Sequence, residues 1–402
     1  MNVSWPMGPL LTGGVALGAL ASIWLGYPAW MWCRARWRPR PMRPDAQAGA
    51  GRRVTVILAT RAAAQAVEAR VRNLLDSAHP GDRLQVMVAV DGDPASVATA
   101  VAGLGPRVRV VGADAPGGKA AALNAGARAA DAEVFVFADT AQRFDERTIP
   151  ELVAALEDPA FGAISGVLVL PSDASPLRLY WAMEAHLRRQ EALVHASIGV
   201  TGAVYAMRAA LWSPLPPGTI LDDVYVPMRL VLDGWRVGVA PRAFAWDERS
   251  FDAGAEVVRK TRTQTGVLQL LHLLPALRRS ANPVRGAFVM HKLARLTTPL
   301  WLLVLVMAGL LLAAPTLAGP VAAVPASTWL AGGAVLVVLA LTPVGRRLAT
   351  LLGYGLGLQW ALVRAVAFGS RGRWAVWEPV PATTPPLHHP TAADQPTKPS
   401  KT

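Results

Sequence analysis

The sequence predicts an α/β protein whose mostly parallel sheet is flanked by apolar helices long enough to cross a membrane. Between residues 53 and 170, apolar β runs alternate with helical segments, which is the pattern of a doubly wound sheet. Residues 1–33 and 296–345 contain no charged side chain. Hydrophobic residues make up 52% of the chain and charged residues 17%, and the mean hydropathy is +0.32, values that favour membrane spans.

The N-terminal apolar segment is expected to span a bilayer. Residues 10–32 are long enough to cross it, and no lysine or arginine precedes them, so a cleaved signal peptide is not expected. Arginines follow at positions 34, 36, 38, 40 and 43. The positive-inside rule therefore predicts an external N-terminus and a cytoplasmic domain after the span.

The net charge of +13 and the single cysteine limit the function classes further. The early basic run interleaves with proline and tryptophan beside an apolar segment, which favours contact with anionic membrane lipids over nucleic acid. Cys33 excludes an internal disulfide and indicates a reducing compartment.

The α/β elements are expected in a regular order after a linker rich in proline. Strands are predicted at 53–59, 84–90 and 108–111, with helices at 62–77 and 97–104. Gly117 and Gly118 then interrupt the pattern, and Lys119 begins a helix that ends near residue 130. A strand at 133–138 stops at Asp139, and 146–157, 161–170 and 177–196 are predicted as helix, strand and helix.

The C-terminal third is expected to return to the membrane. An amphipathic helix is predicted at 255–277, and Pro315, Pro320 and Pro325 divide the next apolar stretch into spans at 296–314 and 328–343. Residues 348–368 are either a third span or an interfacial helix. The expected organisation is 1–33 membrane helix, 34–52 basic linker, 53–254 catalytic domain, 255–295 interfacial helices, 296–369 membrane helices and 370–402 disordered tail.

Acidic residues stand where a nucleotide-binding sheet would need them. Asp91 and Asp139 each end a strand, and parallel strands bring such ends to one edge. A nucleotide diphosphate needs Mg²⁺ or Mn²⁺ on carboxylate oxygen, together with cationic donors for the leaving group. Lys119 and the cluster at 259–262 could supply those cations. One acid of the pair at 222–223 suits a general base for an acceptor hydroxyl.

Each of these signals also has a purely structural explanation. Asp91 before Gly92 is a favourable turn. Asp222 and Asp223 could cap a helix over 224–232, a role compatible with catalysis. The basic cluster at 259–262 is more often a solvated or lipid-facing surface.

Six short motifs, taken in order, resemble those of membrane-embedded family 2 glycosyltransferases, the group with cellulose and hyaluronan synthases and their bacterial relatives. The likeness extends from about residue 54 to 270, and the flanking spans match the family layout. The motifs are VAVDGD at 88–93, GGKAAALNAG at 117–126, FVFADT at 135–140, TGAVYAMR at 201–208, ILDDVYVP at 220–227 and RKTRT at 259–263. The resemblance implies the GT-A fold, a Rossmann-like arrangement.

The resemblance also implies roles for individual residues. Asp139 would bind the divalent metal, Mg²⁺ or Mn²⁺. Asp223 would be the catalytic base, preceded by the acid Asp222. Thr201 and Gly202 would lie in the acceptor region. The nucleotide-sugar would contact Asp91, Gly92, Lys119, Asn124, Arg259, Lys260 and Arg262.

The implied function is that of an inverting glycosyltransferase of the bacterial inner membrane. It would transfer a sugar from a nucleotide-sugar, with a UDP-sugar favoured, to a glycan or lipid-linked acceptor at the cytoplasmic face. Two positions depart from the family pattern: Ala141 replaces the second metal-binding acid, and Thr263 replaces a tryptophan that binds the acceptor in processive synthases. Ala141 favours the alternative, a catalytically inactive membrane scaffold that keeps the fold and binds a partner.

Overall fold

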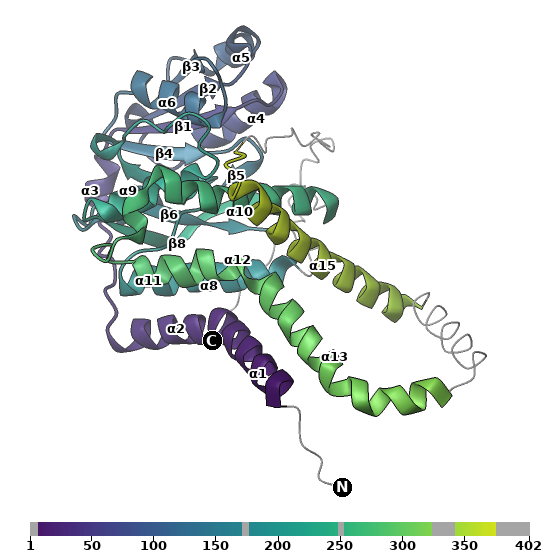
Figure 1. Ribbon diagram of the computed structural model, residues 1–402. Coiled ribbons are helices and arrows are strands. Elements are labelled where there is room, and N and C mark those ends of the chain that lie inside the picture. The colour runs from purple at the N-terminus through teal and green to yellow at the C-terminus, as the bar shows by residue number, and fades with distance from the viewer. Residues whose placement is uncertain (1–6, 171–176, 248–252, 324–341, 375–402) are drawn as a thin grey trace.

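The computed structural model describes residues 7–170, 177–247, 253–323 and 342–374 (Figure 1). Its centre is a mixed sheet with the strand order β3-β2-β1-β4-β7-β6-β8-β5. The strands are β1 Val54–Thr60, β2 Leu84–Val90, β3 Val108–Gly112, β4 Val134–Ala138, β5 Gln142–Phe144, β6 Phe161–Val169, β7 Val204–Arg208 and β8 Arg236–Asp247.

The parallel half of the sheet confirms the sequence prediction. Strands β3, β2, β1 and β4 are parallel neighbours, and Val54 is in register with Leu84 and Val134. Every residue of β1 is buried, and its side chains alternate between two cores. Ile57 belongs to the core under α6 (Lys119–Ala129) and α9 (Asp222–Leu232), whereas Val56 and Leu58 belong to the core under α4, α5 and α7. These last helices are α4 Ala64–Leu75, α5 Pro94–Val101 and α7 Thr148–Leu156.

The other half of the sheet differs from the purely parallel expectation. Strand β7 lies antiparallel between β4 and β6, and β5 lies antiparallel at the edge beside β8. No strand was predicted at either place, because a short buried apolar run such as 204–208 has no helical or strand period that identifies it.

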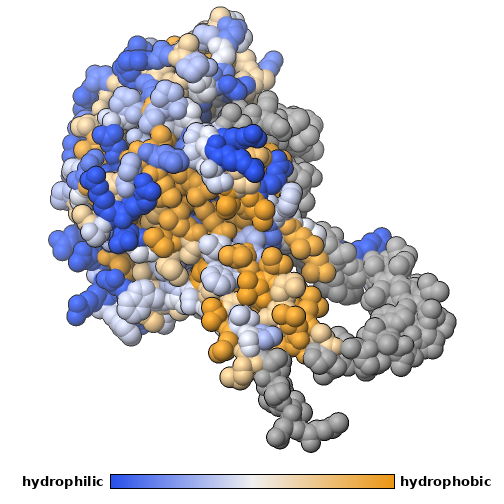
Figure 2. All heavy atoms as spheres, viewed as in Figure 1, coloured by the Kyte–Doolittle hydropathy of each residue, from blue (hydrophilic) through white to orange (hydrophobic). Residues whose placement is uncertain are grey.

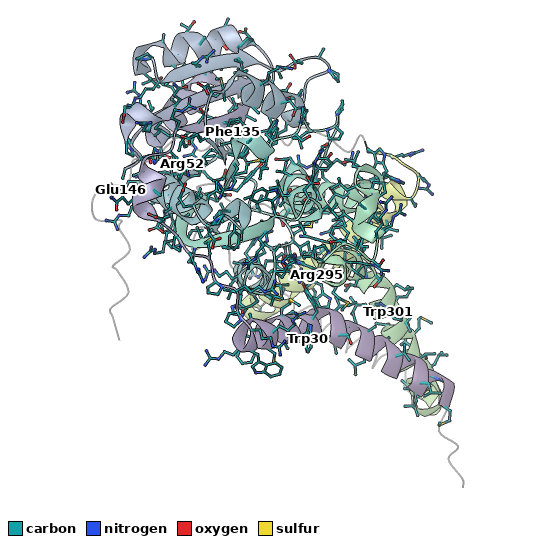
Figure 3. The ribbon with its side chains drawn as sticks, turned by 90° about the vertical axis from the view of Figure 1, so that its left-hand side faces the viewer. Trp30, Arg52, Phe135, Glu146, Arg295 and Trp301 are labelled. Carbon is teal, nitrogen blue, oxygen red and sulfur yellow. The ribbon has the colours of Figure 1, made fainter. Side chains whose placement is uncertain are left out.

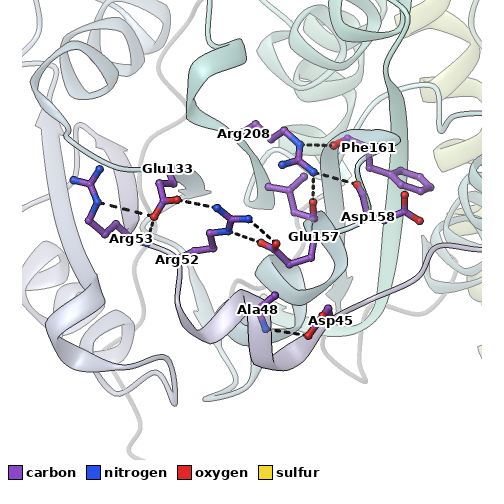
Figure 4. A network of polar contacts seen from close by, with 10 residues as sticks. Asp45, Ala48, Arg52, Arg53, Glu133, Glu157, Asp158, Phe161 and Arg208 are labelled. Carbon is purple, nitrogen blue, oxygen red and sulfur yellow. Dashed lines mark hydrogen bonds and ion pairs between the residues drawn. The ribbon is translucent and has the colours of Figure 1, made fainter.

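The basic linker is held against the catalytic domain. A short helix, α3 (Ala46–Ala50), is capped by Asp45, whose side chain accepts a hydrogen bond from the Ala48 amide. Arg52 joins two acids of the domain, Glu133 at 2.9 Å and Glu157 at 2.8 Å (Figure 4). The chain therefore enters the sheet from a fixed position.

The apolar helices α1 (Met7–Ala21) and α13 (Thr298–Ala323) leave the domain together. With the π-helical turn Ser22–Gly26 and α2 (Tyr27–Trp37), α1 forms a segment long and apolar enough to span a membrane. Arg285–Leu296 and Thr298–Ala314 meet the same test together but are bent by 55°. Figure 2 shows the hydrophobic surface of this region continuing onto the domain. Large apolar side chains are exposed here at Leu11, Val15, Leu303, Val306 and Leu310.

The C-terminal helices correct two expected boundaries. Helix α10 (Ala253–Leu273) stops before Pro275, earlier than predicted, because proline cannot continue the hydrogen-bonding pattern. Helix α13 instead continues through Pro315 and Pro320, so it extends past the end predicted at 314. The predicted span at 328–343, Pro325 and the tail from 375 lie outside the described residues.

Helix α15 (Pro343–Gly369) contains the segment whose position the sequence left open. It packs along α10, and Gly357 approaches so closely that a Cβ there would lie 3.0 Å from Val257. Leu352, Leu356 and Trp360 remain exposed. Exposed apolar side chains of this kind suit both a span and an interfacial helix, so the two predicted alternatives stay open.

Candidate active site

Lys119 connects the acid that ends β4 with the acid that begins α9. Its Nζ lies 3.2 Å from Asp139 Oδ1 and 3.4 Å from Asp222 Oδ2. Lys119 is the first residue of α6 and follows Gly117 and Gly118, whose φ angles of 85° and 94° are readily adopted only by glycine. The glycine pair thus turns the chain so that the lysine points at both carboxylates.

Charges in this cluster influence one another strongly. Although burial opposes it, Asp139 and Asp222 raise the pKa of Lys119 above its usual value, so the ammonium stays charged. Burial, together with the neighbouring Asp222, raises the pKa of Asp223, and the cations Lys119, Arg188 and Lys292 partly offset that rise. A carboxylate with a raised pKa is a stronger base than an ordinary aspartate.

The predicted acceptor residues lie directly against Asp223. A Cβ on Gly202 would be 3.1 Å from the Asp223 Cβ, and the Val200 amide donates a hydrogen bond to the Asp223 carbonyl at 2.8 Å. The Thr201 amide donates to Ser165 Oγ at 2.9 Å, and Arg188 donates to Thr201 Oγ1 at 3.3 Å. The loop before β7 is therefore fixed beside the candidate base.

The helix-capping explanation for the acid pair is corrected by the structure. The residue at the cap position of α9 is Leu221, and it makes no side-chain capping bond. Asp222 and Asp223 occupy the first turn instead, where free backbone N–H groups and the helix dipole stabilise negative charge.

Asp91 faces the glycine turn from the end of β2. Its carboxylate forms an ion pair with Arg61, and a Cβ at Gly117 would lie 2.8 Å from its Oδ1. Strand β1 separates β2 from β4 in the sheet, and all three are parallel, so Asp91 and Asp139 lie at the same edge, as predicted. Gly92 follows at the surface of this edge.

Asn124 has a positioning role that the sequence did not reveal. Its amide donates to the Leu215 carbonyl at 2.9 Å and accepts from the Leu215 amide at 2.8 Å. Both bonds hold the loop that leads into α9. Its expected contact with the nucleotide stays a prediction.

The three basic residues of α10 are not a solvated surface. Arg259 makes two hydrogen bonds of 2.7 Å to the buried Glu256. Lys260 lies 4.2 Å from the centre of the Tyr180 ring, and burial, together with Arg259, lowers its pKa to about 8. Arg262 follows on the same helix. Their proposed contact with a diphosphate remains a prediction.

Asp139, the residue predicted to bind the metal, would suit an ion that takes most of its ligands from a bound nucleotide. Asp139 is 37% exposed at the sheet edge, and the position two residues on is Ala141. Within the described ranges no group of three or more His, Cys, Asp or Glu side chains could hold a metal. One protein carboxylate supplemented by phosphate oxygens is an accepted arrangement for Mg²⁺ or Mn²⁺.

A buried polar network joins helix α8 (Leu177–Val194) to α2 and to the segment that precedes α13. His291 lies between Glu191, at 2.7 Å, and Glu184, at 3.0 Å. Tyr27 donates to Glu191 at 2.5 Å, and Arg295 pairs with Glu184. Figure 3 shows Arg295 where the apolar helices meet the domain. The sequence placed Glu184 and Glu191 on a helix without assigning them partners, since these come from segments 100 or more residues away.

The sheet edge with Asp139, the glycine–lysine turn and the acid pair beside a glycine loop together define a nucleotide-sugar-dependent glycosyltransferase of GT-A fold. The family model described as "Glycosyltransferase like family 2" matches residues 51–266, more than half of the chain. The chain therefore belongs to this family.

Two known proteins are similar to the chain. The solved structure of the mannosyltransferase PcManGT from Pyrobaculum calidifontis, in complex with GDP-Man and Mn²⁺, superposes with a TM-score of 0.66 at 24% identity and covers 90% of this chain and 99% of that one. This likeness supports the GT-A fold. Glycosyltransferase AglD of Haloferax volcanii is 31% identical over 140 residues, which span 33% of this chain and only 22% of AglD.

Proposed function

We propose that the protein is a membrane-bound inverting glycosyltransferase. It transfers a sugar from a nucleotide-sugar to a glycan or lipid-linked acceptor at the cytoplasmic face of a bacterial inner membrane. The observation that carries this proposal is Lys119 bridging Asp139 and Asp222 beside Asp223 and the loop of Thr201 and Gly202. The groups proposed to bind the donor, Lys119 and Asp139, therefore lie next to those proposed to act on the acceptor, Asp223 and the loop of Gly202.

The proposed reaction is a single displacement. An acceptor hydroxyl oxygen forms a bond to the anomeric carbon while the bond from that carbon to the diphosphate oxygen breaks, and the electron pair leaves with the nucleoside diphosphate. Attack from the face opposite the leaving group inverts the anomeric configuration. Asp223 takes the hydroxyl proton, and Lys119 offsets charge on the departing diphosphate. A bound Mg²⁺ or Mn²⁺ would supply further positive charge to that diphosphate.

Membrane attachment is supported by the apolar helices and the basic residues next to them. Arg34 and Arg36 lie in the last turn of α2, at the C-terminal end of the candidate span. This charge asymmetry favours a cytoplasmic catalytic domain.

The proposal is tested with the full-length protein in phosphatidylcholine nanodiscs and a panel of UDP- and GDP-sugars with Mn²⁺. GDP-mannose is included because PcManGT was solved with it. One donor should raise the melting temperature and release its nucleoside diphosphate, and a chelator should abolish the release. If no donor stabilises the protein or is turned over, the enzyme proposal is wrong.

The competing candidate is an inactive scaffold, which Ala141 favours because the metal has one protein carboxylate fewer than in most relatives. A donor that stabilises the protein without turnover under any metal condition would identify the scaffold.

A further inference from the structure

The loop that carries Asp139 is short and lies between two strands. It covers residues 139–141 and joins β4 to β5. Asp139 is its single acid, because Ala141 stands where the family pattern has a second metal-binding carboxylate. A metal held by one protein carboxylate depends strongly on the orientation of that carboxylate, since no second side chain can compensate for a misplaced first one.

Arg70, on α4, holds the backbone of this loop. Its Nε donates a hydrogen bond to the Asp139 carbonyl oxygen at 3.0 Å, and its guanidinium carbon lies 4.2 Å from the centre of the Phe144 ring. The residue is only 4% exposed. Burial of a guanidinium is unfavourable unless its donors are used, and one of these donors is used on the residue predicted to bind the metal.

The same helix also holds the strand that follows the loop. Asn73 accepts a hydrogen bond from the Phe144 amide at 2.9 Å and donates one to the Phe144 carbonyl at 2.9 Å. Arg70 and Asn73 lie about one turn apart on α4, and Arg70 donates to Asn73 Oδ1. The contacts at the two ends of the loop therefore support each other.

Two side chains after Asp139 are fixed as well. Thr140 Oγ1 donates to Thr60 Oγ1, at the end of β1, at 2.8 Å. Gln142 Nε2 donates to Asp247 Oδ2, on β8, at 3.0 Å. Arg70 acts at the first residue of the loop, on the backbone of Asp139 itself. With that backbone held, the Asp139 carboxylate lies beside Lys119 in the candidate site.

We propose that Arg70 is a positioning residue for the metal. By fixing the backbone of Asp139, it keeps the single carboxylate in the orientation that metal binding needs, and it compensates for the absence of a second acid at Ala141. Arg70 acts through Asp139 and needs no contact with the metal or the donor. This inference rests on the proposed function, since metal binding by Asp139 belongs to it.

The test measures nucleotide binding by equilibrium dialysis, using the full-length protein in phosphatidylcholine nanodiscs. Labelled GDP and, in a separate series, labelled UDP are dialysed over a range of Mn²⁺ concentrations and in EDTA. Arg70→Met should raise the Mn²⁺ concentration for half-maximal nucleotide binding by about 10-fold to 100-fold, the usual effect of losing a group that orients a metal ligand. Binding in EDTA should stay the same. Arg70→Lys keeps the charge but not the planar guanidinium, and it should recover part of the Mn²⁺ affinity.

Two controls separate positioning from general stability. Arg208 also holds backbone carbonyls, those of Phe161 at 3.0 Å and Asp158 at 3.1 Å, but it lies beside the opposite end of β4 from Asp139. Arg208→Met should lower the melting temperature without changing the Mn²⁺ dependence. In the Asp139→Asn background, Arg70→Met should change that dependence by less than about twofold, because no carboxylate is left to orient.

An equal Mn²⁺ dependence in wild type and both Arg70 variants overturns the inference. An effect of Arg70→Met that is undiminished in the Asp139→Asn background overturns it too, because Arg70 would then act independently of Asp139. If Arg70→Met does not fold, the same comparisons with Arg70→Lys decide the question. Because dialysis measures binding without turnover, a wild type that binds nucleotide with Mn²⁺ but transfers no sugar refutes only the proposed function.

Discussion

At the scale of single residues, the two acids at the start of α9 have different neighbours. Asp222 touches Lys119, whereas Asp223 faces the loop of Gly202. This difference in neighbours supports the proposed roles, which are charge balance on the donor side for Asp222 and proton transfer on the acceptor side for Asp223.

Asp223→Asn should lower kcat by a factor on the order of 10² to 10⁴ while nucleotide-sugar binding remains nearly intact. The amide keeps the size of the side chain but cannot accept the acceptor proton. Steady-state kinetics and donor-induced thermal stabilisation measure the two effects separately. Asp222→Asn is the companion variant, and it should weaken donor binding more than it lowers kcat. A near wild-type kcat for Asp223→Asn would remove the base assignment.

The pH dependence of kcat should reflect the environment of Asp223. Burial raises its pKa above 3.8, the ordinary aspartate value, so the active, ionised form is lost at a higher pH than for an exposed aspartate. Activity should therefore fall on acidification with a midpoint above 3.8. A kcat profile with Lys119→Met as the comparison measures this, because loss of the nearby ammonium should move the midpoint further upward. If the acidic midpoint of the kcat profile is the same in wild type and Lys119→Met, Lys119 does not influence the pKa of the base.

At the scale of elements, the turn before α6 combines two constraints at one glycine. Gly117 has a positive φ of 85°, and its missing side chain leaves room for Asp91. The turn thus needs glycine both for the backbone and for the carboxylate beside it.

Gly117→Ala should destabilise the protein by roughly 1–2 kcal/mol and raise the donor KM, because the new Cβ strains the backbone and displaces Asp91. Gly103→Ala is the control, since Gly103 has open space around it and an ordinary φ, and alanine there should be neutral or slightly stabilising. Thermal unfolding and donor titration provide both measurements. Equal melting temperatures for the two variants would show that the turn tolerates a side chain.

The sequence predicted elements with a clear period and missed those without one. The strands at 54–60, 84–90 and 134–138 were predicted because each is a continuous apolar run between turn residues, and helical segments separate them along the chain. Strands β7 and β5 were missed because their antiparallel pairing is decided by partners distant in the chain. Lys119, Asp139 and Asp222 could be predicted as candidate site residues because each stands in a recognisable motif. The contact of Arg188 with Thr201 could not be predicted, because it depends on how separate segments pack.

At the scale of the whole molecule, one buried cluster joins α2, the α/β domain and the segment that precedes α13. Tyr27 comes from α2, Glu184 and Glu191 from α8, and His291 from the segment before α13. The apolar helices are thereby fixed to α8, the helix that carries Arg188 beside the candidate site.

His291→Phe should lower the free energy of unfolding by about 3–5 kcal/mol, because it leaves two buried carboxylates without their shared partner while keeping a ring of similar size. Tyr27→Phe removes a single hydrogen bond to the same cluster and should cost less, about 1.5–3 kcal/mol. Denaturation in detergent at pH 7 compares the two.

The same cluster should weaken in acid. Its cations depress the pKa of Glu184 below 4.5 in the folded protein, so this stabilisation is complete above that pH and is lost as the pH falls further. The gap in stability between wild type and His291→Phe should then narrow below that pH. A gap that is independent of pH would mean that packing, and not the charge pairing, is what the variant disturbs.

The order in which the chain is synthesised gives this cluster a further consequence. Tyr27 leaves the ribosome first, Glu184 and Glu191 follow, and His291 arrives 100 residues after Glu191. Until His291 is synthesised, Glu184 and Glu191 lack the side chain that lies between them in the folded protein, and the cluster stays incomplete. We expect a recombinant fragment that ends before residue 291 to lack these contacts and therefore to be less stable than the full-length protein.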